Sequence, residues 1–214
     1  MPRRAGRIVV AAGTNGAGKT SIASELVRAS GAAYYNPDLF AAKLVARGAS
    51  QEDANSTAWR VGYEGLRTAV DRGADFTFET TLGGHSIVRE LHRALELRRQ
   101  VHVFYVGLAS PDLHVARVAA RVARGGHDIP EAKIRERYVK SLANLVGLVG
   151  KATSMHVFDN SDESPDGLPR AALVFRMRVR RLTEPDVATL LGETPEWAKP
   201  VVAAAIKASR RARR

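Results

Sequence analysis

The segment Ile8–Thr20 reads IVVAAGTNGAGKT, in which an apolar run leads directly into three glycines within six positions. Residues 13–20 match the pattern G-x-x-x-x-G-K-[ST] in full, with a predicted strand before it and a predicted helix after it. Gly13 lets the chain turn off the strand, and Gly16 and Gly18 can adopt conformations in which successive backbone N–H groups converge on one anion. The pattern predicts a P-loop that binds a nucleoside triphosphate through Gly13, Thr14, Asn15, Gly16, Ala17, Gly18, Lys19, Thr20 and Ser21.

The end of this pattern carries the groups that act on phosphates. We expect Lys19 to reach the β- and γ-phosphates and the Thr20 hydroxyl to ligate Mg²⁺. The helix that begins near Lys19 adds the positive end of its dipole. A glycine-rich turn without a ligand is the alternative, but it leaves unexplained why strand, pattern and helix occur together.

Short β-rich apolar runs alternate with amphipathic helical stretches along the chain, which predicts an α/β fold with a mostly parallel sheet of about five strands and helices on both faces. The expected strands are Arg7–Ala12, Ala33–Asn36, Phe76–Thr80, Val101–Leu108 and Met155–Asp159, with Ala171–Val179 as a further candidate. We expect one P-loop domain over residues 1–182. Residues 183–214 are expected to form a C-terminal helical appendage that ends in a basic tail.

Composition limits the classes of protein to consider. The 214 residues are 45% hydrophobic and include no cysteine, so disulfides, thiolate metal sites and cysteine nucleophiles are excluded. The chain shows no signal peptide and no apolar stretch long enough to cross a membrane, so we expect a cytoplasmic protein. Five of the eleven net positive charges lie in the last eight residues, KASRRARR, and this concentration weakens a nucleic-acid interpretation of the whole chain.

Two carboxylates lie at the ends of predicted strands, at the edge where a parallel sheet binds ligands. Asp38, in the segment Asn36-Pro37-Asp38, can act as the general base that accepts a proton from an acceptor hydroxyl, or it can cap the following helix. Glu79 and Thr81 alternate to one side of the segment FETT and can bind the acceptor, or Thr81 can cap a helix. We expect the strand before Asp38 to lie beside the first strand.

An arginine row is predicted on the helix within SPDLHVARVAARVARGGHDIP, where Arg117, Arg121 and Arg124 share one face. Guanidinium groups can hold phosphate oxygens with two hydrogen bonds, and Gly125-Gly126 supplies a hinge. Helix, glycine pair and second helix predict a lid over the nucleotide. The alternative is a solvated arginine face that ends at a glycine cap.

These segments together resemble the zeta-toxin-like family of P-loop kinases. The similarity extends from about residue 7 to residue 161, and the stretch with GGHD is its most distinctive part. The resemblance implies a kinase-type sheet, ATP with Mg²⁺, and a sugar nucleotide such as UDP-N-acetylglucosamine as acceptor. By motif it implies Asp38 as general base, Glu79 and Thr81 as sugar contacts, and Arg121 with Arg124 as phosphate-binding lid arginines, for one of which Arg117 or His127 can substitute.

The expected activity is therefore ATP-dependent phosphoryl transfer to an alcohol, with Asp38, Lys19, Arg121 and Arg124 as catalytic residues. The resemblance also makes an antitoxin protein a possible partner. Two alternatives stay open: a P-loop kinase for another small metabolite, and a nucleic-acid-binding ATPase that uses the basic tail.

Overall fold

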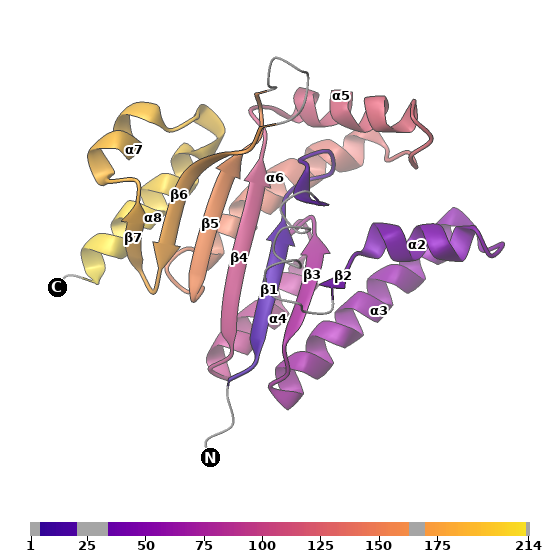
Figure 1. The fold of residues 1–214 in the computed structure, drawn as a ribbon, viewed down its shortest axis with the longest axis horizontal. Coiled ribbons are helices and arrows are strands. Elements are labelled where there is room, and N and C mark those ends of the chain that lie inside the picture. Colours follow the sequence, from indigo (N-terminus) through magenta and orange to yellow (C-terminus); the bar gives the residue numbers. More distant parts are fainter. Residues whose placement is uncertain (1–4, 21–33, 163–169, 213–214) are drawn as a thin grey trace.

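A computed structural model describes residues 5–20, 34–162 and 170–212. Its centre is one seven-stranded sheet with the order β2-β3-β1-β4-β5-β6-β7 (Figure 1). The first five strands in this order are parallel, and β6 and β7 add two antiparallel strands at one edge. The strands are β1 (Arg7–Ala12), β2 (Tyr34–Tyr35), β3 (Phe76–Thr80), β4 (Gln100–Gly107), β5 (Ser154–Asp159), β6 (Ala172–Arg178) and β7 (Arg181–Glu184).

Helices cover both sides of this sheet, and in Figure 1 α4, α6 and α8 pass behind it. The described helices are α2 (Pro37–Val45), α3 (Gln51–Arg72), α4 (His85–Glu96), α5 (Pro111–Val122), α6 (Glu131–Leu148), α7 (Val187–Glu193) and α8 (Lys199–Arg211). The predicted α/β fold with a mostly parallel sheet is confirmed. The strand β7 was not expected from the sequence, because its residues RLTE are mostly exposed and lack an apolar alternation.

The strand β1 lies in the middle of the parallel part, where it pairs with β3 on one side and β4 on the other. On one face Ile8, Val10 and Ala12 have no exposed surface. On the other face Ala11 is buried and Val9 is partly buried, as suits a central parallel strand covered on both faces. The P-loop therefore begins between the carboxyl ends of two neighbouring strands.

The expected adjacency of the second strand and the first is wrong. The strand β2 pairs with β3, and β3 lies between β2 and β1. Tyr34 and Tyr35 are only half-buried, as suits an edge strand, whereas three of the five residues of β3 are buried. Asp38 thus begins its helix one strand further from the P-loop than the sequence predicted.

The C-terminal segment shares the main core. Trp197, Val201, Val202 and Ala205 are buried in the same hydrophobic cluster as the central strands. The boundary expected after residue 182 falls within β7. Within the described ranges, no helix is both long and apolar enough to cross a membrane.

Candidate active site

The P-loop follows β1 and adopts a conformation that only glycine accommodates at three positions. Gly13, Gly16 and Gly18 have φ values of 143°, 82° and 86°. A Cβ atom on Gly13 would lie 2.2 Å from the carbonyl oxygen of Val106, and one on Gly18 would lie 2.5 Å from Nδ2 of Asn160. The glycines are therefore required both by the backbone conformation and by the close approach of neighbouring strands.

Two buried side chains from other elements hold this loop in place. His114 of α5 donates from Nδ1 to the carbonyl oxygen of Asn15 at 2.8 Å, and Asn160, which follows β5, donates from Nδ2 to the carbonyl oxygen of Ala17 at 2.9 Å. His114 is 1% exposed, and burial lowers its pKa to about 4. Since both bonds use carbonyl groups of the loop, they leave its N–H groups to other partners.

The cationic groups of the loop are linked to the rest of the site. Lys19 donates from Nζ to the carbonyl oxygen of Thr14 at 3.3 Å. Burial lowers the pKa of Lys19, while the charges of Glu79 and Asp38 act in the opposite direction. Arg121 and Arg137 add to the lowering through like-charge repulsion, so both guanidinium groups act on the same ammonium. Ser21, expected at the end of the binding segment, lies outside the described residues.

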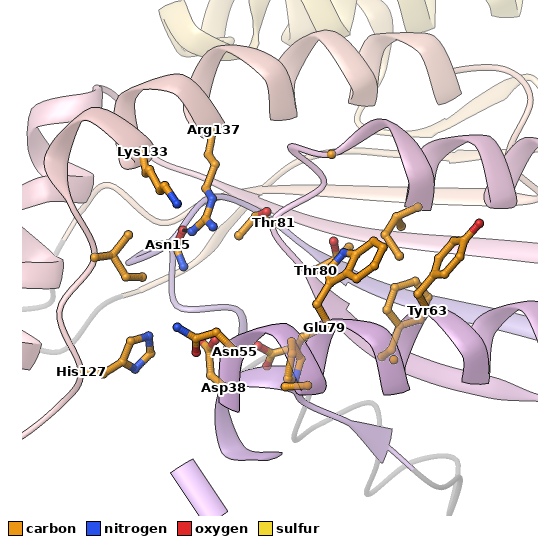
Figure 2. Close-up of a pocket in the computed structure, with 18 of the residues that line it drawn as sticks. Asn15, Asp38, Asn55, Tyr63, Glu79, Thr80, Thr81, His127, Lys133 and Arg137 are labelled. Atoms are coloured by element: carbon orange, nitrogen blue, oxygen red, sulfur yellow. Dashed lines mark hydrogen bonds between the residues drawn. The ribbon is translucent and has the colours of Figure 1, made fainter. Parts of the chain in front are cut away.

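A cleft of about 330 Å³ opens beside the P-loop between α2, α3, the end of β3 and the start of α6 (Figure 2). Its polar residues include Asn15, Asp38, Asn55, Glu79, Thr80, Thr81, His127, Lys133 and Arg137. Aromatic rings of Tyr35, Trp59, Tyr63 and Phe78 form much of the apolar wall. Trp59 is 52% exposed and stacks on Tyr63 with ring centroids 5.2 Å apart. The cleft thus offers polar groups beside a flat aromatic surface.

Asp38 lies in the first turn of α2 and lines this cleft. It does not cap the helix: the Asn36 side chain accepts from the N–H of Leu39 at 3.1 Å and is the N-cap. The alternative of a helix cap is therefore wrong for Asp38. The carboxylate is exposed and close enough to Lys19 to influence its pKa.

Glu79 connects the end of β3 to the start of α2. It is 6% exposed and accepts a hydrogen bond from the hydroxyl of Tyr34. The same hydroxyl accepts from Nδ2 of Asn36 at 3.5 Å. Burial and the hydrogen bond to Glu79 raise the pKa of Tyr34, which keeps the phenol protonated as the donor. The chain Glu79–Tyr34–Asn36 thereby fixes the helix turn that carries Asp38.

Thr81 lies just beyond β3 and lines the same cleft as Glu79. Its Oγ1 accepts from the N–H of Gly83 at 3.4 Å. The helix α4 begins after Gly84 and has no side-chain cap, so Thr81 does not cap it. The structure therefore brings Asp38, from the start of α2, into one cavity with Glu79 and Thr81, from the end of β3.

The three arginines of the predicted row each contact a different backbone carbonyl group. Arg117 donates from Nη2 to the carbonyl oxygen of Ser161 at 3.3 Å, and Arg121 donates from Nη2 to that of His127 at 3.0 Å. Arg124 lies just beyond the end of α5, is exposed, and donates from Nε to the carbonyl oxygen of Ala120 in that helix. Arg121 thus lies near Lys19 and bonds the backbone of His127 at the cleft, whereas Arg124 bonds the end of α5.

Arg137 is the main site residue that sequence reasoning missed. It projects from α6 into the cleft and donates from Nη1 to Oδ1 of Asn15 at 2.8 Å (Figure 2). Lys133, one turn earlier, lines the same wall. The available signal was the spacing of four residues between them on the polar face of the helix after the glycine pair. Asn160 was also missed, although it directly follows a strand at the ligand-binding edge.

The residues present fit Mg²⁺ bound together with a triphosphate. Thr20 is exposed at the start of the helix that follows the loop, where a hydroxyl ligand is expected. Among residues 5–20, 34–162 and 170–212 there is no group of three or more His, Asp or Glu side chains that could form a metal cage. Mg²⁺ typically takes one or two protein ligands and completes its shell with phosphate oxygens and water, so a single threonine hydroxyl beside the loop suits it.

The family described as an AAA domain (AAA_33) matches residues 8–140, which include the P-loop, the cleft and most of α6. The chain belongs to this AAA-domain family. A relative from Haemophilus influenzae, described as an uncharacterized protein, is 30% identical over 129 residues, which are 59% of this chain and 88% of that protein.

Solved structures show a fold similar to that of this AAA-domain protein. The structure titled AvrRxo1-ORF1:-ORF2 with ATP has a TM-score of 0.60 at 17% identity, covering 96% of this chain and 77% of that one. A chain of the PezAT chromosomal toxin–antitoxin system of Streptococcus pneumoniae has a TM-score of 0.57 at 14% identity, covering 98% and 87%. At these identities the similarity establishes the fold, and it extends beyond residue 140 to the C-terminal strands and helices.

Proposed function

We propose that this AAA-domain protein is an ATP-dependent small-molecule kinase that transfers the γ-phosphoryl group to a hydroxyl of an acceptor in the cleft. The observation that carries the proposal is the position of Asp38 in a cleft directly beside the P-loop, within electrostatic reach of Lys19. A motor or switch protein needs no such cavity for a second small molecule. The fold similarity to a protein solved with ATP supports ATP as the donor.

In this mechanism the residues of the chain position two substrates and manage charge. The P-loop amides and Lys19 hold the phosphates, and Arg121 and Arg137 add positive charge where the transferred group passes. Asp38 accepts the proton of the acceptor hydroxyl as its oxygen bonds to the γ-phosphorus and the bond to ADP breaks. Mg²⁺, held by Thr20 with phosphate oxygens, would neutralise charge on the β- and γ-phosphates.

The resemblance to zeta-toxin-like kinases suggests a sugar nucleotide, such as UDP-N-acetylglucosamine, as the acceptor. The cleft is compatible with this class: Glu79 and Thr81 offer oxygen atoms for hydroxyl groups, and Trp59 offers a ring face on which a sugar or base can pack. The fold similarity to a toxin–antitoxin component also supports an antitoxin as a possible partner. Both points belong to the proposal.

The test is a phosphoryl-transfer assay with purified protein, ATP, Mg²⁺ and UDP-N-acetylglucosamine, read by mass spectrometry of the acceptor. A phosphorylated sugar nucleotide supports the full proposal. Phosphorylation of a different alcohol in a metabolite screen supports the kinase and removes this acceptor. Failure to phosphorylate any acceptor, despite ATP binding, contradicts the kinase itself.

A matched pair of variants tests the role of Asp38. Asp38→Asn should lower kcat by about 10²- to 10⁴-fold while ATP affinity is retained, since a general base is lost and the loop is intact. Asp112→Asn is the control, because Ser110-Pro111-Asp112 starts α5 as Asn36-Pro37-Asp38 starts α2. Asp112 pairs with Arg135 outside the cleft, so its variant should keep full activity.

A further inference from the structure

A strongly basic surface lies at the end of the molecule opposite the P-loop. The segments 170–183 and 197–212 contain nine Lys and Arg residues and no Asp or Glu. Seven cations belong to the surface, which we call the basic face: Lys151, Arg178, Arg180, Arg181, Lys207, Arg210 and Arg211. All seven residues are exposed.

Printed contacts show that these cations come from three segments packed together. The β6–β7 turn contacts the loop before β5, because Arg180 donates from Nε to the carbonyl oxygen of Gly150 at 3.2 Å. The helix α8 contacts β7, since the N–H of Leu182 donates to Oγ of Ser209 at 3.4 Å. Ala208 also packs closely on Gly150, where an added Cβ would lie 2.8 Å from the Ala208 Cβ. These contacts therefore place the three segments that carry the cations side by side.

The basic face does not belong to the nucleotide site. Arg178 pairs with Ser154, the first residue of β5, whereas the P-loop lies at the carboxyl ends of the parallel strands. In Figure 1 the β6–β7 turn and the end of α8 lie at the opposite end of the sheet from the loop after β1. Nucleotide binding therefore gives no reason for this concentration of charge.

Neighbouring carboxylates do not neutralise the basic face. Within the part of the chain that the structure describes, no ion pair involves any of its seven cations. By contrast, Arg176 at the other end of the same hairpin pairs with Glu184 at 2.8 Å. The positive potential is thus open to an external anion.

The turn between β6 and β7 is built from residues that the conformation disfavours. Val179 and Arg180 have φ values of 41° and 64°, a region in which a two-residue hairpin turn normally contains Asn and Gly. A β-branched residue with positive φ is an outlier in proteins. Val179, which is 64% exposed, and Arg180 occupy the tip of this turn. Strained backbone of this kind concentrates at functional sites.

We propose that the basic face binds the phosphate backbone of duplex DNA without sequence specificity. Five of its seven cations are arginines, which suit phosphate oxygens. A stable protein partner would need an apolar centre, but Val179 is the exposed apolar residue next to these cations, and Phe175 and Trp197 are buried. Without exposed rings for base stacking, the face favours a duplex over a single strand.

The test measures binding of the full chain to a fluorescein-labelled 20-base-pair DNA by fluorescence anisotropy at several salt concentrations. The variant R178Q/R181Q/R210Q/R211Q leaves Arg180 and its contact with Gly150 in place. We expect it to bind at least tenfold more weakly at low salt. The slope of log K against log salt should become shallower by about 3 to 4, since each lost phosphate contact removes about 0.9.

The control variant K43Q/R47Q/R72Q/R89Q removes the same charge from exposed positions on and beside α2, α3 and α4. It should bind DNA nearly as tightly as the unmodified protein. Equal weakening in both variants would overturn the proposal, because net charge alone would then explain binding. The proposal also fails if the unmodified protein does not bind the duplex, or if it binds single-stranded DNA, polyglutamate or anionic vesicles as tightly. Kinase activity should be unaffected by the quadruple change in the basic face, so this result is independent of the proposed function.

Discussion

Replacing His114 by asparagine tests whether a buried neutral imidazole supports the P-loop. In the folded protein the ring is 1% exposed, and burial lowers its pKa to about 4. In the unfolded chain the pKa returns to about 6.5. Between these values the unfolded chain binds a proton that the folded protein does not, so stability falls as the pH falls through this window.

The size of the effect follows from these two pKa values. Proton linkage gives a loss of about 2 kcal/mol between pH 7 and pH 5 from this one residue. Asparagine can place its Nδ2 near the position of the imidazole Nδ1 and so keep the bond to the carbonyl oxygen of Asn15. His114→Asn should therefore reduce the stability lost between pH 7 and pH 5 by about 2 kcal/mol.

The assay is urea denaturation of both proteins at pH 7 and pH 5. The change in the free energy of unfolding between the two pH values is compared between the proteins, so that the contributions of the other histidines cancel. This matters because burial also lowers the pKa of His156 to about 4. His85→Asn, at the exposed first position of α4, is the control and should leave the pH difference unchanged. Equal pH dependence in His114→Asn and the unmodified protein would refute the reasoning. So would a titration midpoint of the His114 ring near 6.5 by NMR.

Three further changes probe other parts of the molecule. Gly18→Ala places a Cβ 2.5 Å from Nδ2 of Asn160 at a φ of 86°. The ATP affinity measured by calorimetry should fall at least tenfold, while the circular dichroism spectrum stays unchanged. An unaltered affinity would contradict the close packing of the loop. Tyr34→Phe removes the donor to the buried Glu79 carboxylate and should destabilise the fold by about 2 kcal/mol. This loss corresponds to a fall in Tm of about 4–8 °C, and an unchanged Tm would argue against the contact. Val179→Asn relaxes the strained turn and should raise the free energy of unfolding by about 1 kcal/mol, which urea denaturation would detect; destabilisation would mean that the turn is not strained.

Much of the fold was readable because its signals are local. The P-loop pattern, the apolar strand before it and the alternation of strands with amphipathic helices predicted a mostly parallel α/β sheet, and the structure confirms it. In α6, the buried residues Ile134, Ser141, Leu145 and Leu148 follow one another at spacings of seven, four and three, which is a helical stripe. Buried strands and helical stripes leave their pattern in consecutive residues, so no knowledge of distant contacts is needed.

The order of the strands was harder to predict from the sequence. The insertion of β3 between β1 and β2 depends on which strand buries more apolar surface, and β2 is only two residues long. The strand β7 was missed because its pairing with β6 is made by backbone atoms, while its side chains are mostly exposed. Pairing of this kind leaves little trace in residue type.

By itself, the sequence determined that a phosphate-binding loop follows a central strand, and that acidic and polar residues follow nearby strands. Only the tertiary structure decided that Arg137 bonds Asn15, that His114 and Asn160 hold the loop, and that Tyr34 joins Glu79 to the helix of Asp38. The reason is physical: a glycine pattern reflects backbone conformation within a few residues. A hydrogen bond between residues 45 to 143 positions apart exists only once the sheet has brought their elements together.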